Sequence, residues 1–213
     1  MTNLALFVWR VSVTIQNKLD SIKIPLMDGI EMRSMPAEDF QPLFDRYRPE
    51  IFANMPTVDM RSVYNQVEKA SAEELNSFMG SPVSLNLGVF HGDKFIGWHC
   101  GDQKSREEFY MRNTGLFPEY QGRGIYTAML KHIPKALAAI GFQVISSKHN
   151  ATNNRVIIPK LKAGFIISGL DISDRFGTLV RLEYFTNPTR RALMDFRSGQ
   201  ATPSADLRAL MGL

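Results

Sequence analysis

One segment of the sequence combines residues whose types and spacing could bind an anion. Residues 116–127, LFPEYQGRGIYT, connect an expected strand to an expected helix, with Gly122 and Gly124 directly before the helix. The first amides of a helix lack intrahelical partners and the helix dipole is positive there, while glycine lets a phosphate approach the backbone. Arg123 and the Thr127 hydroxyl could add contacts. The segment therefore predicts a phosphate or pyrophosphate site.

The same pattern also fits a tight structural turn between a strand and a helix, and the physics of the segment leaves both interpretations open. Two other phosphate-binding motifs are missing from the sequence. It contains neither G-x-x-x-x-G-K-[ST] nor G-x-G-x-x-G followed by a downstream acid. The sequence thus argues against an ATPase or a dinucleotide-dependent enzyme.

The segment resembles the cofactor motif of the GNAT superfamily of acetyl-coenzyme A-dependent N-acetyltransferases. Gln121-Gly-Arg-Gly-Ile-Tyr126 resembles the family's [Q/R]-x-x-G-x-[G/A], and Leu116-Phe-Pro118 resembles the V-x-P that precedes it on a splayed strand. Tyr126 departs from the motif, because it places a phenol where the family has Gly or Ala. The resemblance implies that acetyl-coenzyme A is bound by Leu116, Phe117, Gln121, Gly122, Arg123, Gly124, Tyr126 and Thr127.

A second match lies downstream. Asn153, Gly164 and Phe165 have the spacing of the family's N-x-x-A-x-x-x-Y-x-x-x-G-F ending. The resemblance implies that Asn153 helps to hold the pantetheine arm or the helix that covers it. The family's Tyr, commonly the acid that protonates the leaving thiolate, is Lys160 here. Lys160 could steady a thiolate by its charge, but we expect this lysine to be solvated, as most lysines are. Water or Tyr126 remain candidates for the acid.

The family's chemistry is direct attack of an amine on the acetyl thioester, which needs a polarised carbonyl and a base. A backbone N–H near Leu116, left free by the splayed strand, could polarise the carbonyl as in an oxyanion hole. Period-two alternation places Glu108 and Tyr110 on the same side of the strand as Leu116, so either could be the base. A solvent-facing Glu and a core Tyr fit equally well. His99 and His149 have no visible partner and are interpreted as structural.

Alternation and helical periodicity define the elements that must position these residues. Strands are expected at 30–35, 85–91, 94–100, 108–116 and 142–147, with a hairpin over 165–185. Helices are expected at 37–47, 57–80, 124–141 and 153–163, the second with a capping box at residues 71–74 and an apolar stripe of Leu75, Phe78 and Met79. The expected fold is α/β (α+β), a GNAT-like mixed, mostly antiparallel central sheet with helices on both faces.

We expect three regions in the chain: an N-terminal extension (1–21), the GNAT acetyltransferase domain (22–186) and a C-terminal helical tail (187–213) with helices at 187–197 and 202–211. The tail carries an apolar stripe of Leu207, Leu210 and Met211, and residues 4–13 form a second apolar patch. Such surfaces need a cover, so we expect a homodimer with both chain ends near the interface.

Composition limits the remaining possibilities. The 213 residues carry a single cysteine, Cys100, which indicates a reducing compartment, and we expect a cytoplasmic protein. Arg10 interrupts the apolar N-terminus well before membrane-spanning length, so no membrane segment is expected. A net charge of +4 without a dense Lys/Arg block argues against a nucleic-acid partner, although Arg190-Arg191 keeps that weaker alternative open. No metal site is expected.

Together these features predict an enzyme that moves an acetyl group from acetyl-coenzyme A to a primary amine of a small molecule, amino acid or peptide. Nothing in residues 37–80 or near Arg175, where such folds set the acceptor, specifies which amine. The aromatic residues of this region are interpreted as core. Lys160 and Tyr126 support an alternative, a catalytically degenerate acyl-coenzyme A-binding module with a regulatory role.

Overall fold

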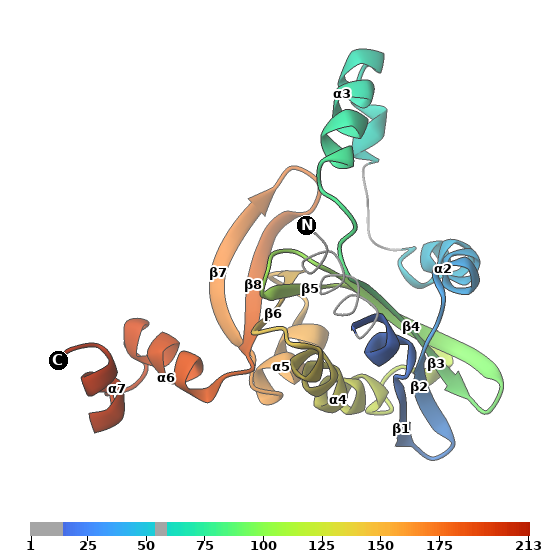
Figure 1. The fold of residues 1–213 in the computed structure, drawn as a ribbon. Helices are drawn as coiled ribbons and strands as arrows, with labels where there is room; N and C mark the ends of the chain where they lie inside the picture. The colour runs from blue at the N-terminus through green and yellow to red at the C-terminus, as the bar shows by residue number, and fades with distance from the viewer. Residues whose placement is uncertain (1–14, 54–58) are drawn as a thin grey trace, which may run out of the picture.

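A computed structural model describes residues 15–53 and 59–213, and its centre is one eight-stranded sheet (Figure 1). The strand order is β1-β2-β3-β4-β5-β6-β8-β7, and the pairs are antiparallel except for β5 and β6, which are parallel. The strands are β1 (Lys23–Met27), β2 (Ile30–Ser34), β3 (Ser84–His91), β4 (Lys94–Gln103), β5 (Glu108–Leu116), β6 (Val144–Asn150), β7 (Ile166–Ser173) and β8 (Gly177–Phe185). The expected mixed, mostly antiparallel sheet is therefore confirmed.

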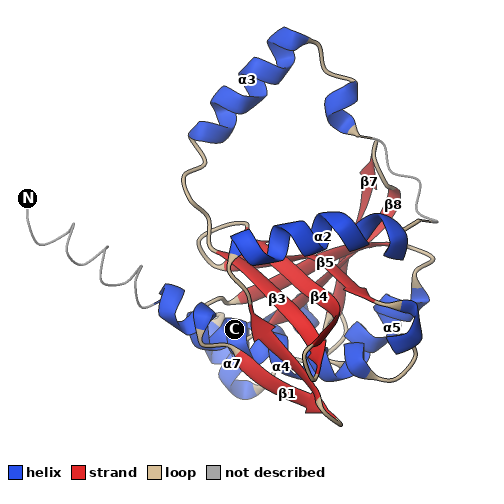
Figure 2. Ribbon diagram, turned by 90° about the vertical axis from the view of Figure 1, so that its right-hand side faces the viewer, coloured by secondary structure: helices blue, strands red, loops and turns tan. Residues whose placement is uncertain are grey.

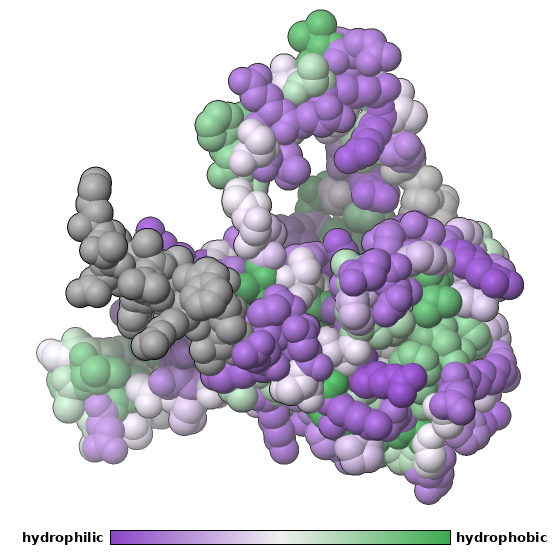
Figure 3. All heavy atoms as spheres, turned by 45° about the vertical axis from the view of Figure 1, so that its right-hand side comes forward, coloured by the Kyte–Doolittle hydropathy of each residue, from purple (hydrophilic) through white to green (hydrophobic). Residues whose placement is uncertain are grey.

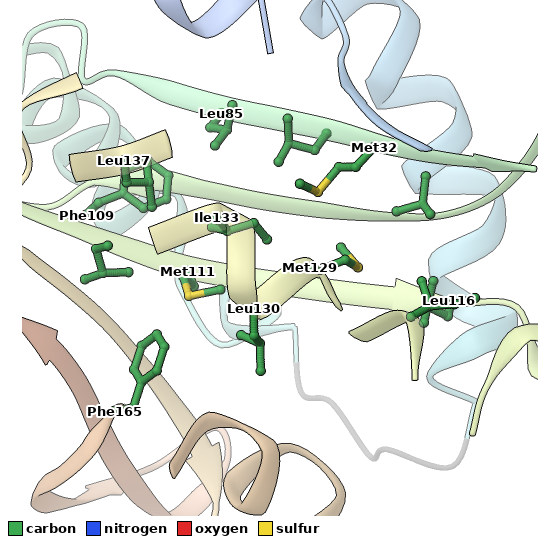
Figure 4. Close-up of a cluster of buried hydrophobic side chains, with 14 of the residues drawn as sticks. Met32, Leu85, Phe109, Met111, Leu116, Met129, Leu130, Ile133, Leu137 and Phe165 are labelled. Carbon is green, nitrogen blue, oxygen red and sulfur yellow. The ribbon is translucent and has the colours of Figure 1, made fainter. Parts of the chain in front are cut away.

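Helices cover both faces of the sheet (Figure 2). On one face lie α4 (Ile125–Ile140) and α5 (Asn154–Lys162), and on the other lies α2 (Ala37–Ile51). The α4 sequence repeats apolar residues at helical spacing, so one side of the helix buries Met129, Ile133 and Leu137 against the sheet (Figure 4). These side chains pack with Phe109 and Met111 of β5 in the main hydrophobic core.

A smaller, aromatic core lies between α2 and the sheet. Phe40, Trp98 and Cys100 are its buried members, and Phe44 stacks on Phe40 and meets Trp98 in a T-shaped, edge-to-face arrangement. Tyr47 and Phe52 also pack against this cluster. The interpretation of the aromatic residues of α2 as core is confirmed for Phe40, which is 2 % exposed.

The helix α3 (Gln66–Ser77) stands away from the sheet, and none of its residues is buried (Figure 3). Its N-cap is Asn65, which forms a capping box with Glu68, so the expected capping box at residues 71–74 is wrong. The capping-box spacing recurs twice in this stretch, and the upstream copy caps the helix. The apolar stripe of Leu75, Phe78 and Met79 is exposed, so no core forms here.

Two C-terminal helices, α6 (Pro188–Arg197) and α7 (Ala205–Leu210), follow the last strand of the domain. Arg190 forms two hydrogen bonds with Glu107 at 2.8 and 2.9 Å, and Arg191 donates to the Gly164 carbonyl at 2.6 Å. Leu207 of α7 is 4 % exposed within the single chain. One residue of the expected dimer stripe is therefore already covered by the chain itself.

The structure adds β1, which the sequence pattern did not indicate, and a short helix at residues 15–20 whose Leu19 is buried. It also places β6 at Val144–Asn150, which begins two residues and ends three residues later than the expected strand 142–147. The apolar patch at residues 4–13 lies outside the described residues. No helix in the described part of the chain combines the length and apolar character needed to cross a membrane.

Candidate active site

The two parallel strands at the centre of the sheet separate partway along their length. The strands β5 and β6 are paired from Glu108 and Val144 to Tyr110 and Ser146, which are the last paired residues. Beyond this pair β5 continues to Leu116 and β6 to Asn150. A strand edge that loses its partner presents N–H and C=O groups without sheet hydrogen bonds. The expected splay is confirmed, and it creates a V-shaped opening between β5 and β6.

The backbone of Leu116 faces this opening. The Phe117 N–H donates to the Ile96 carbonyl of β4 at 2.9 Å, and adjacent residues of an extended strand direct their backbone groups to opposite edges. The Leu116 N–H therefore points away from β4, toward the separated edge. The Gln121 side-chain amide donates to the Leu116 carbonyl at 2.9 Å on the same edge. Gln121 thus fixes the end of β5 and leaves the Leu116 N–H available to a ligand.

A glycine-containing turn links the opening to α4. Gly122 has φ +73° and Gly124 has φ +81°, so both adopt the left-handed conformation that favours glycine. Gly124 is the N-cap of α4, and it supplies no side-chain cap for the first amides of the helix. A Cβ at Gly122 would meet nothing within 4 Å, which shows open space beside the turn. The expected anion-binding geometry, uncapped helical amides reached through open space, is present.

The other residues of the expected cofactor motif differ in their surroundings. Arg123 is exposed and its guanidinium lies 5.2 Å from the centre of the Tyr120 ring, while Thr127 is exposed on the first turn of α4. Tyr126 is partly buried against the main core, and burial raises the pKa of its phenol well above the ordinary value. Tyr126 is therefore neutral at physiological pH. Phe117 packs on Tyr47, with ring centres 4.8 Å apart.

Asn153 lies at the end of the loop between β6 and α5. It is the N-cap of α5, but its side chain makes no cap hydrogen bond. Its backbone N–H donates to the Asn150 carbonyl at 2.9 Å, which holds the turn. The Asn153 amide is thus positioned by the backbone while its polar atoms make no bond to the helix it begins.

The structure corrects the expected position of Glu108 and Tyr110 relative to Leu116. The register of β5 against β4 shifts at Arg112, which has no partner in the ladder. Such a bulge adds one residue and reverses the alternation of side chains beyond it. Met111 and Leu116 consequently both join the core beneath α4, where simple alternation would separate them. Glu108 and Tyr110 instead project from the face that α2 covers.

Glu108 and Tyr110 lie where the opening begins. Burial raises the pKa of the Glu108 carboxyl, but hydrogen bonds from Ser146 at 2.5 Å and from Lys104 at 2.9 Å outweigh it, so the net pKa is below the ordinary value. Glu108 is therefore ionised at neutral pH. Burial raises the pKa of the Tyr110 phenol, which is neutral under the same conditions. Neither group is poised to titrate near neutral pH.

A cluster of buried polar side chains lies on the opposite face of the opening, beneath α5. The Lys160 Nζ donates to the Ser147 Oγ at 2.7 Å and lies 3.3 Å from the Met111 Sδ. The same Ser147 Oγ is 3.0 Å from the Nε2 of His149. Lys160 is 1 % exposed, so the expectation of a solvated lysine is wrong. Lys160 is buried because it lies on the side of α5 that packs against the sheet.

The expectation that His99 and His149 lack partners is also wrong. The His99 Nδ1 is 2.8 Å from the Thr114 Oγ1, and His149 contacts Ser147 as described. Burial, followed by the charge of Lys160, lowers the pKa of each imidazole to about 3. Burial alone lowers the pKa of Lys160 to about 7. No sequence pattern revealed this cluster, because its members come from different strands and a helix.

Comparison with known proteins agrees with this geometry. Residues 40–165 match the profile of the acetyltransferase (GNAT) family. No curated protein sequence gives a significant match.

Solved structures share the fold at low sequence identity. The ribosomal-protein-S5-alanine acetyltransferase of Vibrio fischeri has a TM-score of 0.58 and 15% identity, covering 78% of this chain and 98% of its own. A variant of the spermidine N-acetyltransferase of Vibrio cholerae has a TM-score of 0.54 and 11% identity, covering 75% and 95%. A GNAT family acetyltransferase of Elizabethkingia anophelis with bound acetyl-CoA has a TM-score of 0.51 and 12% identity, covering 75% and 99%. The family profile spans more than half of the sequence, and the separated strands lead to an uncapped, glycine-rich helix start. This chain therefore belongs to the acetyltransferase (GNAT) family.

Proposed function

We propose that the protein transfers an acetyl group from acetyl-coenzyme A to a primary amine of a small molecule, amino acid or peptide. The observation that carries this proposal is the separation of β5 from β6 together with the uncapped, glycine-containing start of α4 directly after β5. A long ligand that is anionic at one end and reactive at the other fits these two features. Membership of the acetyltransferase family supplies the class of reaction.

The residues present fit the co-substrate. We assign its pyrophosphate to the backbone amides of the turn at Gly122 and Gly124 and of the first turn of α4, with Arg123 and the Thr127 hydroxyl as further donors. Tyr126 contributes its backbone within the same turn, since its ring is packed on the core. Asn153 and the backbone N–H of Leu116 would hold the pantetheine arm, while Phe117 fixes the strand end through its bond to Ile96 and Gln121 fixes Leu116. When bound, acetyl-coenzyme A supplies an activated acetyl thioester.

The remaining catalytic roles are assigned to groups of the protein in the opening and on the α2 face of the sheet. A backbone N–H of the separated part of β5, near Leu116, is proposed to polarise the thioester carbonyl. On the α2 face, Glu108 and Tyr110 are proposed as the catalytic pair that receives the amine. An ionised Glu108 attracts a cationic amine and can accept its proton directly or through water. The acceptor would therefore approach from the side of α2 and α3.

The acceptor class is supported by the structural neighbours. Their names specify the alanine of a ribosomal protein and spermidine, both of which present amines. The domain proposed to do this work comprises residues 22–186, preceded by an extension (1–21) and followed by the helical tail (187–213). Cytoplasmic location and homodimer formation remain predictions, and we propose no membrane, nucleic-acid or metal partner.

Thermal unfolding with ligand tests the cofactor assignment. Coenzyme A that binds the folded state at about 100 times its Kd should stabilise it by about 3 kcal/mol, which is a Tm increase of about 5–10 °C for a chain of this size. Gly124→Val should abolish this increase, because the new side chain enters the phosphate approach. Gly80→Val is the matched control, since Gly80 also has positive φ, +71°, and has open space around it, but lies at the end of α3. No increase at millimolar coenzyme A would refute the assignment.

Turnover separates the enzyme from the degenerate binding module. The protein would be incubated with acetyl-coenzyme A and an amine panel that includes spermidine, free amino acids and alanine-terminated peptides, and thiol release would be followed. Amine-dependent thiol release supports the proposed enzyme. Ligand-dependent stabilisation without thiol release for any amine would instead favour the acyl-coenzyme A-binding module.

A further inference from the structure

Lys160 occupies a defined position relative to the opening between β5 and β6. The last paired residues of the two strands are Tyr110 and Ser146, and the next residue on each strand is Met111 and Ser147. The Lys160 Nζ contacts both of these next residues, at 3.3 Å from the Met111 Sδ and 2.7 Å from the Ser147 Oγ. The amine therefore lies at the apex of the opening, where the strands begin to separate, on the face opposite Glu108.

The charge of Lys160 is not balanced by any anion in the described structure. Residues 15–53 and 59–213 place no carboxylate within ion-pair distance of the Nζ. The groups that face it are His99 of β4, Met111 of β5, Ser147 and His149 of β6, and the Phe165 ring, whose centre is 4.5 Å away. Both imidazoles are neutral at physiological pH. A buried cation without a counter-ion favours any anion that forms beside it.

The hydrogen bonds around Ser147 orient the amine. A protonated Lys160 can only donate, so the Ser147 Oγ accepts from it and directs its own proton elsewhere. The Nε2 of His149, at 3.0 Å and neutral, is the available acceptor. Ser147 and His149 therefore act as positioning residues that hold an N–H bond of Lys160 in a fixed direction.

We infer that Lys160 is the acid of the acetyl transfer proposed above, on which this assignment rests, and that its ammonium protonates the thiolate of coenzyme A as it leaves. The amine nitrogen of the acceptor forms the new C–N bond while the C–S bond breaks. The amine's proton passes to the Glu108 side of the sheet, and an N–H proton of Lys160 passes to the sulfur. Lys160 becomes neutral and regains a proton from solvent after the product leaves.

The acidity of Lys160 suits this task. An ammonium with a pKa of about 7 is a stronger acid than an ordinary thiol, whose pKa is about 8.5, so the transfer to sulfur is favourable. A solvated lysine, with a pKa near 10.4, would make the same transfer unfavourable. The burial of Lys160 thus supplies a proton donor where the family's motif has a tyrosine.

Titration of Lys160 itself is a test that needs no turnover. In protein labelled with ¹³C at the lysine Cε, one NMR signal should titrate near neutral pH and be absent from Lys160→Met. Coenzyme A should raise the midpoint of that signal relative to desulfo-coenzyme A, because a sulfur that can become anionic favours the ammonium. Identical midpoints with the two ligands would place the sulfur away from Lys160 and overturn the inference.

Kinetics provide the second test. Lys160→Met should lower kcat by about 100-fold or more with little change in the KM for acetyl-coenzyme A, and the loss of activity as pH rises above neutral should disappear. Lys160→Tyr should restore part of kcat because it returns a proton donor, and Lys162→Met, which removes an exposed lysine of the same helix, should match the wild type.

The two proposals fail in different ways. If the wild type releases thiol and Lys160→Met keeps its kcat and pH profile while remaining folded, Lys160 is not the acid and the acetyltransferase assignment stands. If the wild type releases no thiol with any amine, the assignment itself fails, and the role of Lys160 fails with it.

Discussion

Replacing Lys160 with methionine should stabilise the protein at neutral pH, by an amount that falls as pH rises. Lys160 is 1 % exposed, and burial lowers its pKa from 10.5 to about 7. The unfolded chain therefore binds a proton more tightly at this residue than the folded protein does. The wild type loses stability as pH falls from about 10 to about 7, and below this range the penalty is constant because both states are protonated.

The size of the effect follows from the two pKa values. Each pKa unit is worth about 1.4 kcal/mol, so the penalty is about 4 kcal/mol at pH 7 and about 2 kcal/mol at pH 9. Methionine has a similar length, no charge and no titration. The variant also lacks the hydrogen bond from Lys160 to Ser147, which costs about 1–3 kcal/mol at every pH. This cost lowers the net gain in stability but does not change its dependence on pH. The stability advantage of Lys160→Met should thus shrink by about 2 kcal/mol between pH 7 and pH 9.

Urea denaturation of both proteins between pH 7 and pH 9.5 measures this slope directly. The control is Lys162→Met, whose exposed side chain stays in water in both states, so its stability should follow the wild type across the range. A constant difference between Lys160→Met and the wild type would show that Lys160 keeps an ordinary pKa in the fold. That result would also remove the acidity argument for its role in proton transfer.

Three further predictions concern other parts of the molecule. The folded state keeps His99 neutral, with a pKa of about 3, so acidification from pH 6.5 to 5 should lower the free energy of unfolding by about 2 kcal/mol through this residue. His99→Gln should flatten that decline, as measured by urea denaturation at these pH values. Glu108→Gln and Tyr110→Phe should each lower kcat while leaving the coenzyme A-dependent rise in Tm intact; an unchanged kcat in both variants would place the base elsewhere. Light scattering should show a dimer, and removal of residues 187–213 should weaken it; a monomeric full-length chain refutes the dimer, and a truncated chain that stays dimeric removes the tail from the interface.

Local sequence signals were sufficient where the structure depends on local interactions. Strand β5 begins at Glu108 and ends at Leu116, as alternation predicted, and α4 ends at the expected Gly141. The start of α4 follows from Gly122 and Gly124, since their backbone conformation is accessible mainly to glycine. The geometry of the glycine turn could therefore be predicted from the sequence.

Side-chain direction along β5 could not be predicted in the same way. The bulge at Arg112 depends on how β5 pairs with β4, and a single inserted residue transfers Glu108 and Tyr110 to the α2 face. Likewise, the capping-box spacing occurs at two places before Gly80, and local chemistry alone does not choose between them. The copy at Asn65 caps the helix.

The sequence by itself determined the local features of this protein: a strand and a helix joined by a glycine turn, which we propose binds an anion, and a lysine in place of the family's tyrosine. Only the tertiary structure decided whether that lysine is solvated or buried. Residue type predicts a solvated ammonium, but α5 packs Lys160 against Ser147 and Met111 from two separating strands. The resulting loss of water, which no local pattern encodes, lowers its pKa to about 7 and changes a surface cation into a buried proton donor.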